Sequence, residues 1–195
     1  MTNALDATLA ATLLPTKPSL RLARDAGLAI IGALALALSA KIQVPFTPVP
    51  MTLQTLVVLA LGAAFGARVA AATVALYLVE GLLGLPVFAG AIAGPAYMMG
   101  PTGGFLAGFL VAATLIGLLA ERGWDRSWVW LTGAMTLGHV AIFALGFAWL
   151  ATLIGPEKAF ALGVAPFALA TIVKTLLATA LVGAGWNAAG RAPGL

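Results

Sequence analysis

The chain has no cysteine, one histidine and few charged residues, and each scarcity excludes a class of chemistry. Without cysteine there are no disulfides and no thiolate metal sites. A serine hydrolase needs a nucleophile held beside a base, and no serine motif of that kind accompanies His139. The sequence also lacks the GxxxxGK P-loop that holds nucleotide phosphates. We therefore expect a protein that is not an enzyme, with no catalytic residues, no metal site and no cofactor.

The scarcity of charge is typical of membrane proteins. Charged residues make up 8% of the 195 residues, hydrophobic residues make up 62%, and the mean hydropathy is +1.09. Soluble domains carry about 25% charged residues. A membrane-crossing helix needs roughly 20 apolar residues, so the length allows about six crossings and no separate soluble domain. The net charge of +4 is not gathered in one cluster, so nucleic acid is not expected as a partner.

The predicted fold class is all-α, an integral membrane protein with six transmembrane helices. The predicted helices cover residues 25–41, 52–66, 68–83, 105–120, 127–154 and 160–186. Thr52, which follows Pro50 closely, is the predicted N-cap of the second helix. The helices form one membrane domain, residues 25–187. This domain lies between an N-terminal cytoplasmic extension, residues 1–24, which lacks the basic start of a signal peptide, and a short cytoplasmic tail, residues 188–195.

The segment between the third and fourth predicted helices, Gly84 to Phe105, is unusual in composition. It reads GLPVFAGAIAGPAYMMGPTGGF, which is rich in glycine and proline but contains no charge. Both residue types disfavour a helix. Apolar, irregular backbone at membrane level is tolerated only where it is buried in protein or lines a cavity. We therefore expect this Gly/Pro-rich segment to close over a small ligand.

Basic residues are distributed unevenly among the predicted loops. If both termini are cytoplasmic, the inner segments hold most of the basic residues, as the positive-inside rule requires. The inner residues are Lys17, Arg21, Arg24, Arg68, Arg122, Arg126 and Arg191, and the outer ones are Lys41 and Lys158. The sequence predicts a multi-pass protein of the cell (cytoplasmic) membrane, with both termini cytoplasmic and a ligand that enters from outside.

Lys174 and His139 both lie inside predicted helices, away from the predicted loops. Lys174 is deep in the last one, where a lysine costs roughly 2.5–3.5 kcal/mol on insertion scales and is too far from the helix ends to reach water. A functional role is therefore favoured for Lys174. For His139 we expect a packed, hydrogen-bonded core residue rather than a ligand contact.

Four motifs occur in an order and spacing that resemble a known family. They are VPFTPVPMTLQT, YLVEGLLGLPVFA, GPTGGFLAGF, and GVAPF followed by Lys174. Together they are similar to the BioY family, the biotin-specific S components of energy-coupling-factor transporters, over residues 26–182. The resemblance implies a six-helix protein that captures biotin on the outer side with high affinity. It also implies partnership with a transmembrane coupling protein and ATP-hydrolysing subunits, which fits the missing P-loop.

The sequence departs from the family pattern at one position. Thr171 stands where the family has an aspartate, three residues before the lysine of the last helix. Thr171 and Lys174 are one turn apart on the same helix face, and we expect both to contact a polar end of biotin. A hydroxyl does not hold two N–H groups as a carboxylate does. Glu80, on the third predicted helix, is the candidate that would compensate.

The other predicted substrate-binding residues lie in or just after the Pro-rich link, residues 42–51, or belong to the Gly/Pro-rich segment. They are Gln54, Thr52, Phe46, Phe88, Tyr97, Gly100 and Thr102. Most have a second interpretation: helix capping for Gln54 and Thr52, packing for the phenylalanines and the glycine, and interfacial anchoring for the tyrosine.

The first predicted helix carries alanines at four-residue spacing, Ala29, Ala33 and Ala37. Small residues at this spacing allow close helix approach in lipid. The resemblance implies that this stripe docks the coupling protein, and ordinary packing within the chain is the alternative.

The leading function is biotin uptake as an S component, with biotin and membrane lipid as partners. The alternatives are an S component for another small vitamin, a membrane scaffold without a ligand, and a membrane-embedded hydrolase. Lys174 argues against the scaffold, and the missing catalytic groups argue against the hydrolase. The sequence leaves open two arrangements, a homo-oligomer that works alone and a complex with the ATPase module.

Overall fold

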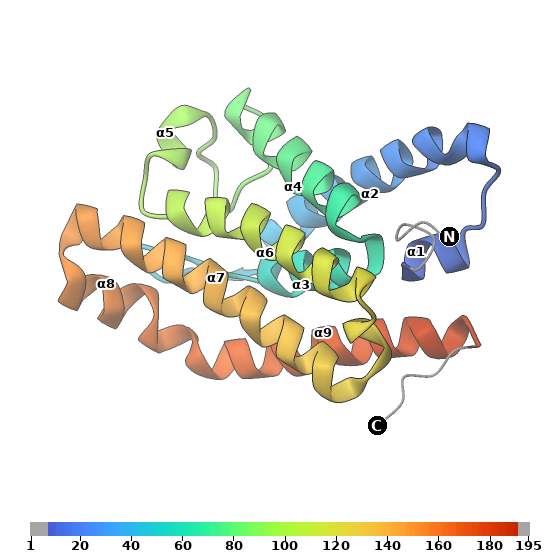
Figure 1. The fold of residues 1–195 in the computed structure, drawn as a ribbon. Helices are drawn as coiled ribbons and strands as arrows, with labels where there is room; N and C mark the ends of the chain where they lie inside the picture. The colour runs from blue at the N-terminus through green and yellow to red at the C-terminus, as the bar shows by residue number, and fades with distance from the viewer. Residues whose placement is uncertain (1–7, 191–195) are drawn as a thin grey trace.

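The computed structural model describes residues 8–190 and is mostly helical (Figure 1). Its α-helices are α1 Leu9–Leu13, α2 Arg21–Lys41, α3 Gln54–Phe65, α4 Ala67–Leu82, α5 Pro95–Met98, α6 Gly103–Glu121, α7 Trp128–Ile154, α8 Pro156–Gly163 and α9 Ala168–Ala188. Its 3-10 turns are η2 Pro18–Leu20, η3 Trp124–Arg126 and η4 Ala165–Phe167. The all-α prediction is confirmed.

Within these residues, four helical stretches are long and apolar enough to cross a membrane. They are Pro18–Lys41, Gly103–Glu121, Trp128–Ile154 and Pro156–Ala188. The stretch Gln54–Phe65 is apolar but shorter. At 1.5 Å per residue, this helix spans about 18 Å, less than the roughly 30 Å of a bilayer core.

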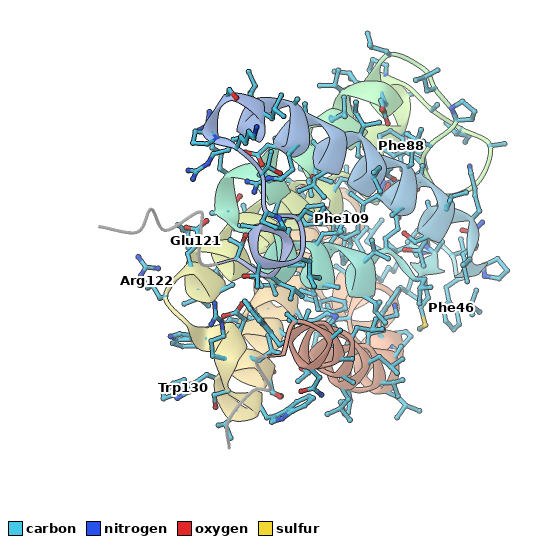
Figure 2. All side chains as sticks on the ribbon, turned by 90° about the vertical axis from the view of Figure 1, so that its right-hand side faces the viewer. Phe46, Phe88, Phe109, Glu121, Arg122 and Trp130 are labelled. Atoms are coloured by element: carbon cyan, nitrogen blue, oxygen red, sulfur yellow. The ribbon has the colours of Figure 1, made fainter. Side chains whose placement is uncertain are left out.

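The core is built around α6 and α7. These two helices form the most extensive helix pair, with α3 and α4 packed on α6, and α9 packed on α3 and α7. Close approach depends on glycine, because a Cβ at Gly108 would lie 2.7 Å from Ile142 Cα. Figure 2 shows Phe109 in the interior, where its side chain is 5% exposed.

The Pro-rich link contains a small β-hairpin that the sequence did not predict. Strands β1 Gln43–Val44 and β2 Met51–Thr52 pair antiparallel, with Gln43 opposite Thr52. The pairing gives backbone N–H and C=O groups of the link partners within the chain. Helix α3 therefore begins at Gln54 with Leu53 as its N-cap, and the prediction of Thr52 as N-cap is wrong. The Thr52 hydroxyl nevertheless accepts the Gln54 N–H at 3.3 Å.

The predicted helix 160–186 is wrong at its start. The chain forms α8, then the η4 turn, and α9 begins only at Ala168. Pro166 explains the break, because proline lacks an N–H and disfavours helical geometry in the residue before it. Lys174 consequently lies within the first two turns of α9 rather than at the middle of a long helix.

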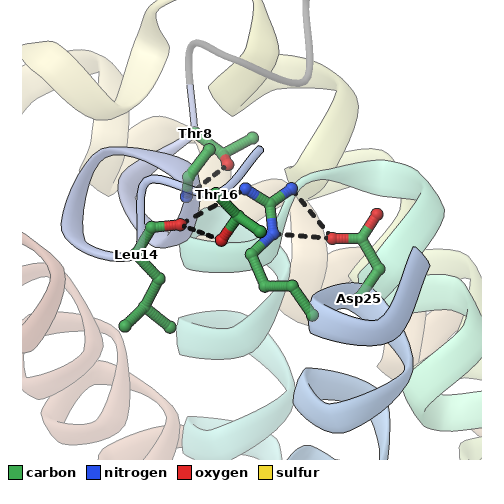
Figure 3. A network of polar contacts seen from close by, with 6 residues as sticks. Thr8, Leu14, Thr16 and Asp25 are labelled. Carbon is green, nitrogen blue, oxygen red and sulfur yellow. Dashed lines mark hydrogen bonds and ion pairs between the residues drawn. The ribbon is translucent and has the colours of Figure 1, made fainter. Parts of the chain in front are cut away.

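The N-terminal extension is partly helical and is tied to the start of α2. Arg24 binds Asp25 at 2.9 Å and donates to the Leu14 carbonyl at 3.5 Å, and the Thr16 hydroxyl donates to the same carbonyl at 3.0 Å (Figure 3). Helix α2 therefore begins at Arg21, a turn earlier than predicted. Residues 1–7 of the predicted extension and residues 191–195 of the predicted tail lie outside the described residues.

Helix α1 lies at the same end of the molecule as the turn between α3 and α4. Leu9 is 5% exposed and lies against Gly185, close to the end of α9. Glu121 Oε1, at the end of α6, accepts the Ala67 N–H at 2.8 Å. This carboxylate sits at the N-terminus of α4, where the helix dipole favours negative charge. These contacts gather α1, the α3–α4 turn, the end of α6 and the end of α9.

Candidate functional site

A cavity lies where the Pro-rich link, the Gly/Pro-rich segment and the start of α9 meet. Its free volume is about 50 Å³. It is lined by Val49, Pro50, Thr52, Gln54, Thr55, Ala89, Tyr97, Thr102, Phe105, Leu106, Phe109, Ile142, Phe143, Phe167, Thr171 and Lys174. Mostly apolar walls with a few convergent polar groups are typical of small-molecule sites.

Lys174 supplies the positive charge of this cavity. Its Nζ donates to the backbone carbonyl of Thr52 at 2.6 Å, which joins α9 to strand β2. The side chain is half-buried, and Thr171 lines the cavity one turn earlier on the same helix. An ammonium carries three donors, so the bond to Thr52 leaves two for a ligand.

Gln54 is the most connected polar side chain in the lining. It is 3% exposed, and its Nε2 donates to the Tyr77 hydroxyl at 2.6 Å and to the Leu36 carbonyl at 3.4 Å. Its Oε1 accepts from the Thr52 hydroxyl at 3.2 Å. The Tyr77 hydroxyl donates to the Val87 carbonyl at 3.3 Å. This network ties α3 to α2, to α4 and to the Gly/Pro-rich segment.

Tyr97 and Thr102 bring the Gly/Pro-rich segment into the lining. Burial raises the pKa of the Tyr97 phenol above its ordinary value, and a hydrogen bond with Thr102 acts in the opposite direction. The phenol is therefore neutral at physiological pH. The ring of Phe88 stacks on the Tyr97 ring, with 4.8 Å between centroids.

Four predicted site residues are not among the described residues that line the cavity: Phe46, Glu80, Phe88 and Gly100. Phe88 is fully buried behind Tyr97 and supports the wall without forming it. Phe46 is 42% exposed and packs on Phe167. The Gly100 carbonyl accepts the Trp149 indole N–H at 2.9 Å, which fixes the segment to α7. Glu80 is half-buried and is not among the lining residues, so the cavity has no carboxylate at the position where Thr171 replaces the family's acid.

Sequence reasoning missed the aromatic wall. Phe105 and Phe109 from α6, Phe143 from α7 and Phe167 from η4 line the cavity. The Phe143 ring packs against Phe105, with 6.1 Å between ring centroids, and against Phe167, with 5.9 Å. In an apolar helix, pattern does not separate a lining ring from a packed one. The GVAPF motif was the available signal for Phe167, because the proline break beside it places the ring at a helix start.

His139 has the role that its sequence position predicts. It is 3% exposed, and its Nδ1 is 3.0 Å from the Thr175 hydroxyl of α9. It lines a separate groove of about 910 Å³ between α7 and the α8–α9 region. That groove is almost wholly apolar and bordered by exposed Val140, Ile172 and Leu176. Small-molecule sites combine apolar walls with a few polar groups that fix the ligand, so the smaller cavity, which holds Lys174 and Gln54, is the candidate site.

The alanine stripe of α2 faces the inside of the protein. Ala29 is 7% exposed, Ala33 is fully buried and Ala37 is half-buried. Helix α2 packs on α4, and a Cβ at Gly32 would lie 2.5 Å from Thr73 Cγ2. The stripe therefore does not present the exposed surface that the docking interpretation requires. It serves the alternative role, close packing within the chain.

Comparison with known proteins places the chain in a family. Residues 7–191 match the BioY family. The chain is 38% identical to the probable biotin transporter BioY of Pyrococcus horikoshii, covering 82% of this chain and 93% of that protein. It is also 38% identical to the biotin transporter BioY of Thermotoga maritima, over 70% of this chain and 80% of that protein. Its fold matches a crystal structure of the S-component for biotin from an ECF-type ABC transporter, with a TM-score of 0.76 and 23% identity over 86% of this chain and 93% of that one. The chain is thus a member of the BioY family.

Proposed function

We infer that this chain captures biotin at the outer face of the cell membrane, as the substrate-binding S component of an ECF-type transporter. The observation that carries the proposal is the cavity that combines four phenylalanine rings with the Lys174 ammonium and neutral hydrogen-bonding groups. Biotin has an apolar thiophane ring and valeryl chain between two polar ends. Family membership supports the same substrate.

In the proposed complex, Lys174 donates to a polar end of biotin, most simply the ureido oxygen, and Thr171 lies beside it. The aromatic wall covers the apolar middle. The free volume of about 50 Å³ is below the roughly 300 Å³ or more of typical ligand pockets. Binding therefore requires the walls to separate, and the link and the Gly/Pro-rich segment are the irregular parts of the lining.

The proposed topology has six crossings, formed by α2, α3, α4, α6, α7 and α9, with both termini cytoplasmic. The clustering of α1, the α3–α4 turn and the end of α6 at one end supports it, because these parts carry or adjoin most of the basic residues. In Figure 2, Arg122 and Trp130 lie on the opposite side of the view from Phe46. Reporter fusions at Glu157 and at the C-terminus should report opposite faces of the membrane, and the same face for both would contradict six crossings.

The proposed partners are biotin, membrane lipid, a transmembrane coupling protein and ATP-hydrolysing subunits. Uptake of labelled biotin by cells that express this chain, with and without such a module, tests whether the module is needed. Uptake without the module would favour a homo-oligomer that works alone.

The second candidate is an S component for another small vitamin. It is favoured because none of the described residues that line the cavity carries a carboxylate. Calorimetric titration of the purified protein with biotin decides between the two. Saturable binding that other vitamins do not displace supports biotin, and no binding of biotin refutes the first proposal.

A further inference from the structure

The Gln54 amide is held in one orientation. The Leu36 carbonyl can only accept, so the amide atom next to it, 3.4 Å away, is the nitrogen. The second N–H of that nitrogen goes to the Tyr77 hydroxyl at 2.6 Å. Tyr77 is consistent with this role, because its own proton goes to the Val87 carbonyl. Both amide donors of Gln54 are therefore used within the protein.

The amide oxygen of Gln54 still has an unused lone pair. An amide oxygen accepts two hydrogen bonds, and Oε1 receives one, from the Thr52 hydroxyl at 3.2 Å. Gln54 lines the cavity. It consequently offers an acceptor to a ligand and no donor.

The neighbouring Thr55 hydroxyl is buried without a partner in the described part of the chain. A helical threonine often bonds the carbonyl four residues earlier. For Thr55 that residue is Met51, which belongs to β2 and precedes the helix. Thr55 also lines the cavity. A buried, unpaired hydroxyl costs about 1–3 kcal/mol, and a ligand N–H would remove that cost.

We propose that the first turn of α3 is the acceptor subsite of the cavity: Gln54 Oε1 and Thr55 Oγ1 accept hydrogen bonds from ligand N–H groups. The inference rests on the proposed function, in which the cyclic urea of biotin supplies two such groups. The acceptors are neutral oxygens, because none of the described lining residues carries a carboxylate. Tyr77 is a positioning residue that keeps the amide oxygen toward the ligand.

The test combines protein variants with ligand variants. The ligands are biotin and its two cyclic carbamate analogues, in each of which one ureido N–H is replaced by a ring oxygen of similar size. The protein variants are Gln54→Leu, Thr55→Val and Tyr77→Phe. The matched control is Thr114→Val, since Thr114 donates to the Leu110 carbonyl at 2.7 Å and does not line the cavity. Calorimetry on purified, monodisperse proteins gives each dissociation constant.

We expect Gln54→Leu and Thr55→Val each to weaken biotin binding by roughly 2- to 13-fold, the range for one neutral hydrogen bond. Each of these two substitutions should also reduce the ratio of affinities for biotin and for one of the carbamate analogues. Tyr77→Phe should reduce the same affinity ratio that Gln54→Leu reduces. If the substitutions weaken the binding of all three ligands equally, or do not weaken it, the subsite proposal is wrong. Binding of biotin by the wild-type protein would still support the proposed function in that case. If the wild type does not bind biotin, both proposals fail.

Discussion

Replacing Lys174 by methionine tests the central charge of the proposed site. Lys174 Nζ already donates to the Thr52 carbonyl at 2.6 Å, which leaves two of its three N–H donors for the proposed bond to biotin. A hydrogen bond from a charged group contributes about 1.5–3 kcal/mol, and each 1.4 kcal/mol is tenfold in affinity. Lys174→Met should therefore weaken biotin binding by roughly 10- to 150-fold. The protein should still insert and fold, because methionine has a similar length and no charge to desolvate.

The measurement is calorimetric titration of purified, monodisperse variants with biotin. Lys158→Met is the matched control, since Lys158 is exposed on α8 and does not line the cavity. The control should bind as the wild type does. Wild-type affinity in Lys174→Met would refute the reasoning, and loss of monodispersity would instead show that the bond to Thr52 holds the fold together.

Three further predictions follow from burial and charge. Thr171→Asp adds a carboxylate beside the ammonium and should tighten biotin binding or leave it unchanged, whereas Thr171→Val should weaken it less than Lys174→Met does; calorimetry checks both. Ala33→Trp should reduce the yield of folded protein, because Ala33 is fully buried and overpacking costs about 1–3 kcal/mol, whereas Leu34→Trp, at a site 56% exposed, should not; size-exclusion profiles compare them. Burial raises the pKa of Asp125 from 3.8 to about 6. Because the folded state then holds the proton more tightly, this group makes the protein less stable as pH rises from about 4 to 6. Asp125→Asn should remove that fall from melting curves, and an unchanged pH profile would contradict the assignment.

The position of the proline break shows where sequence reasoning stops. Pro166 was visible in the sequence, but the chain around it is apolar enough to read as one long helix. In the structure the helix is interrupted there and α9 starts at Ala168. Lys174 consequently lies beside the end of the Pro-rich link, where it binds the Thr52 carbonyl. The sequence shows the proline but not whether the helix stops there. Packing between segments far apart in the sequence fixes the end of the helix at this proline.

The sequence by itself determined the class of the protein and the polar residues worth testing. Hydrophobic runs, the bias of basic residues and the family motifs do not depend on how the helices pack, so they could be read directly. The tertiary structure decided which candidates share a cavity. It left Glu80 out of the described lining, placed Phe88 behind Tyr97, turned Ala33 inward and added Thr55 to the lining. Several of these outcomes depend on contacts between segments far apart in the chain; the bond from Lys174 to Thr52, for example, joins residues 122 positions apart. The local sequence pattern does not predict such contacts, because a membrane helix is apolar on both its lipid-facing and its protein-facing sides.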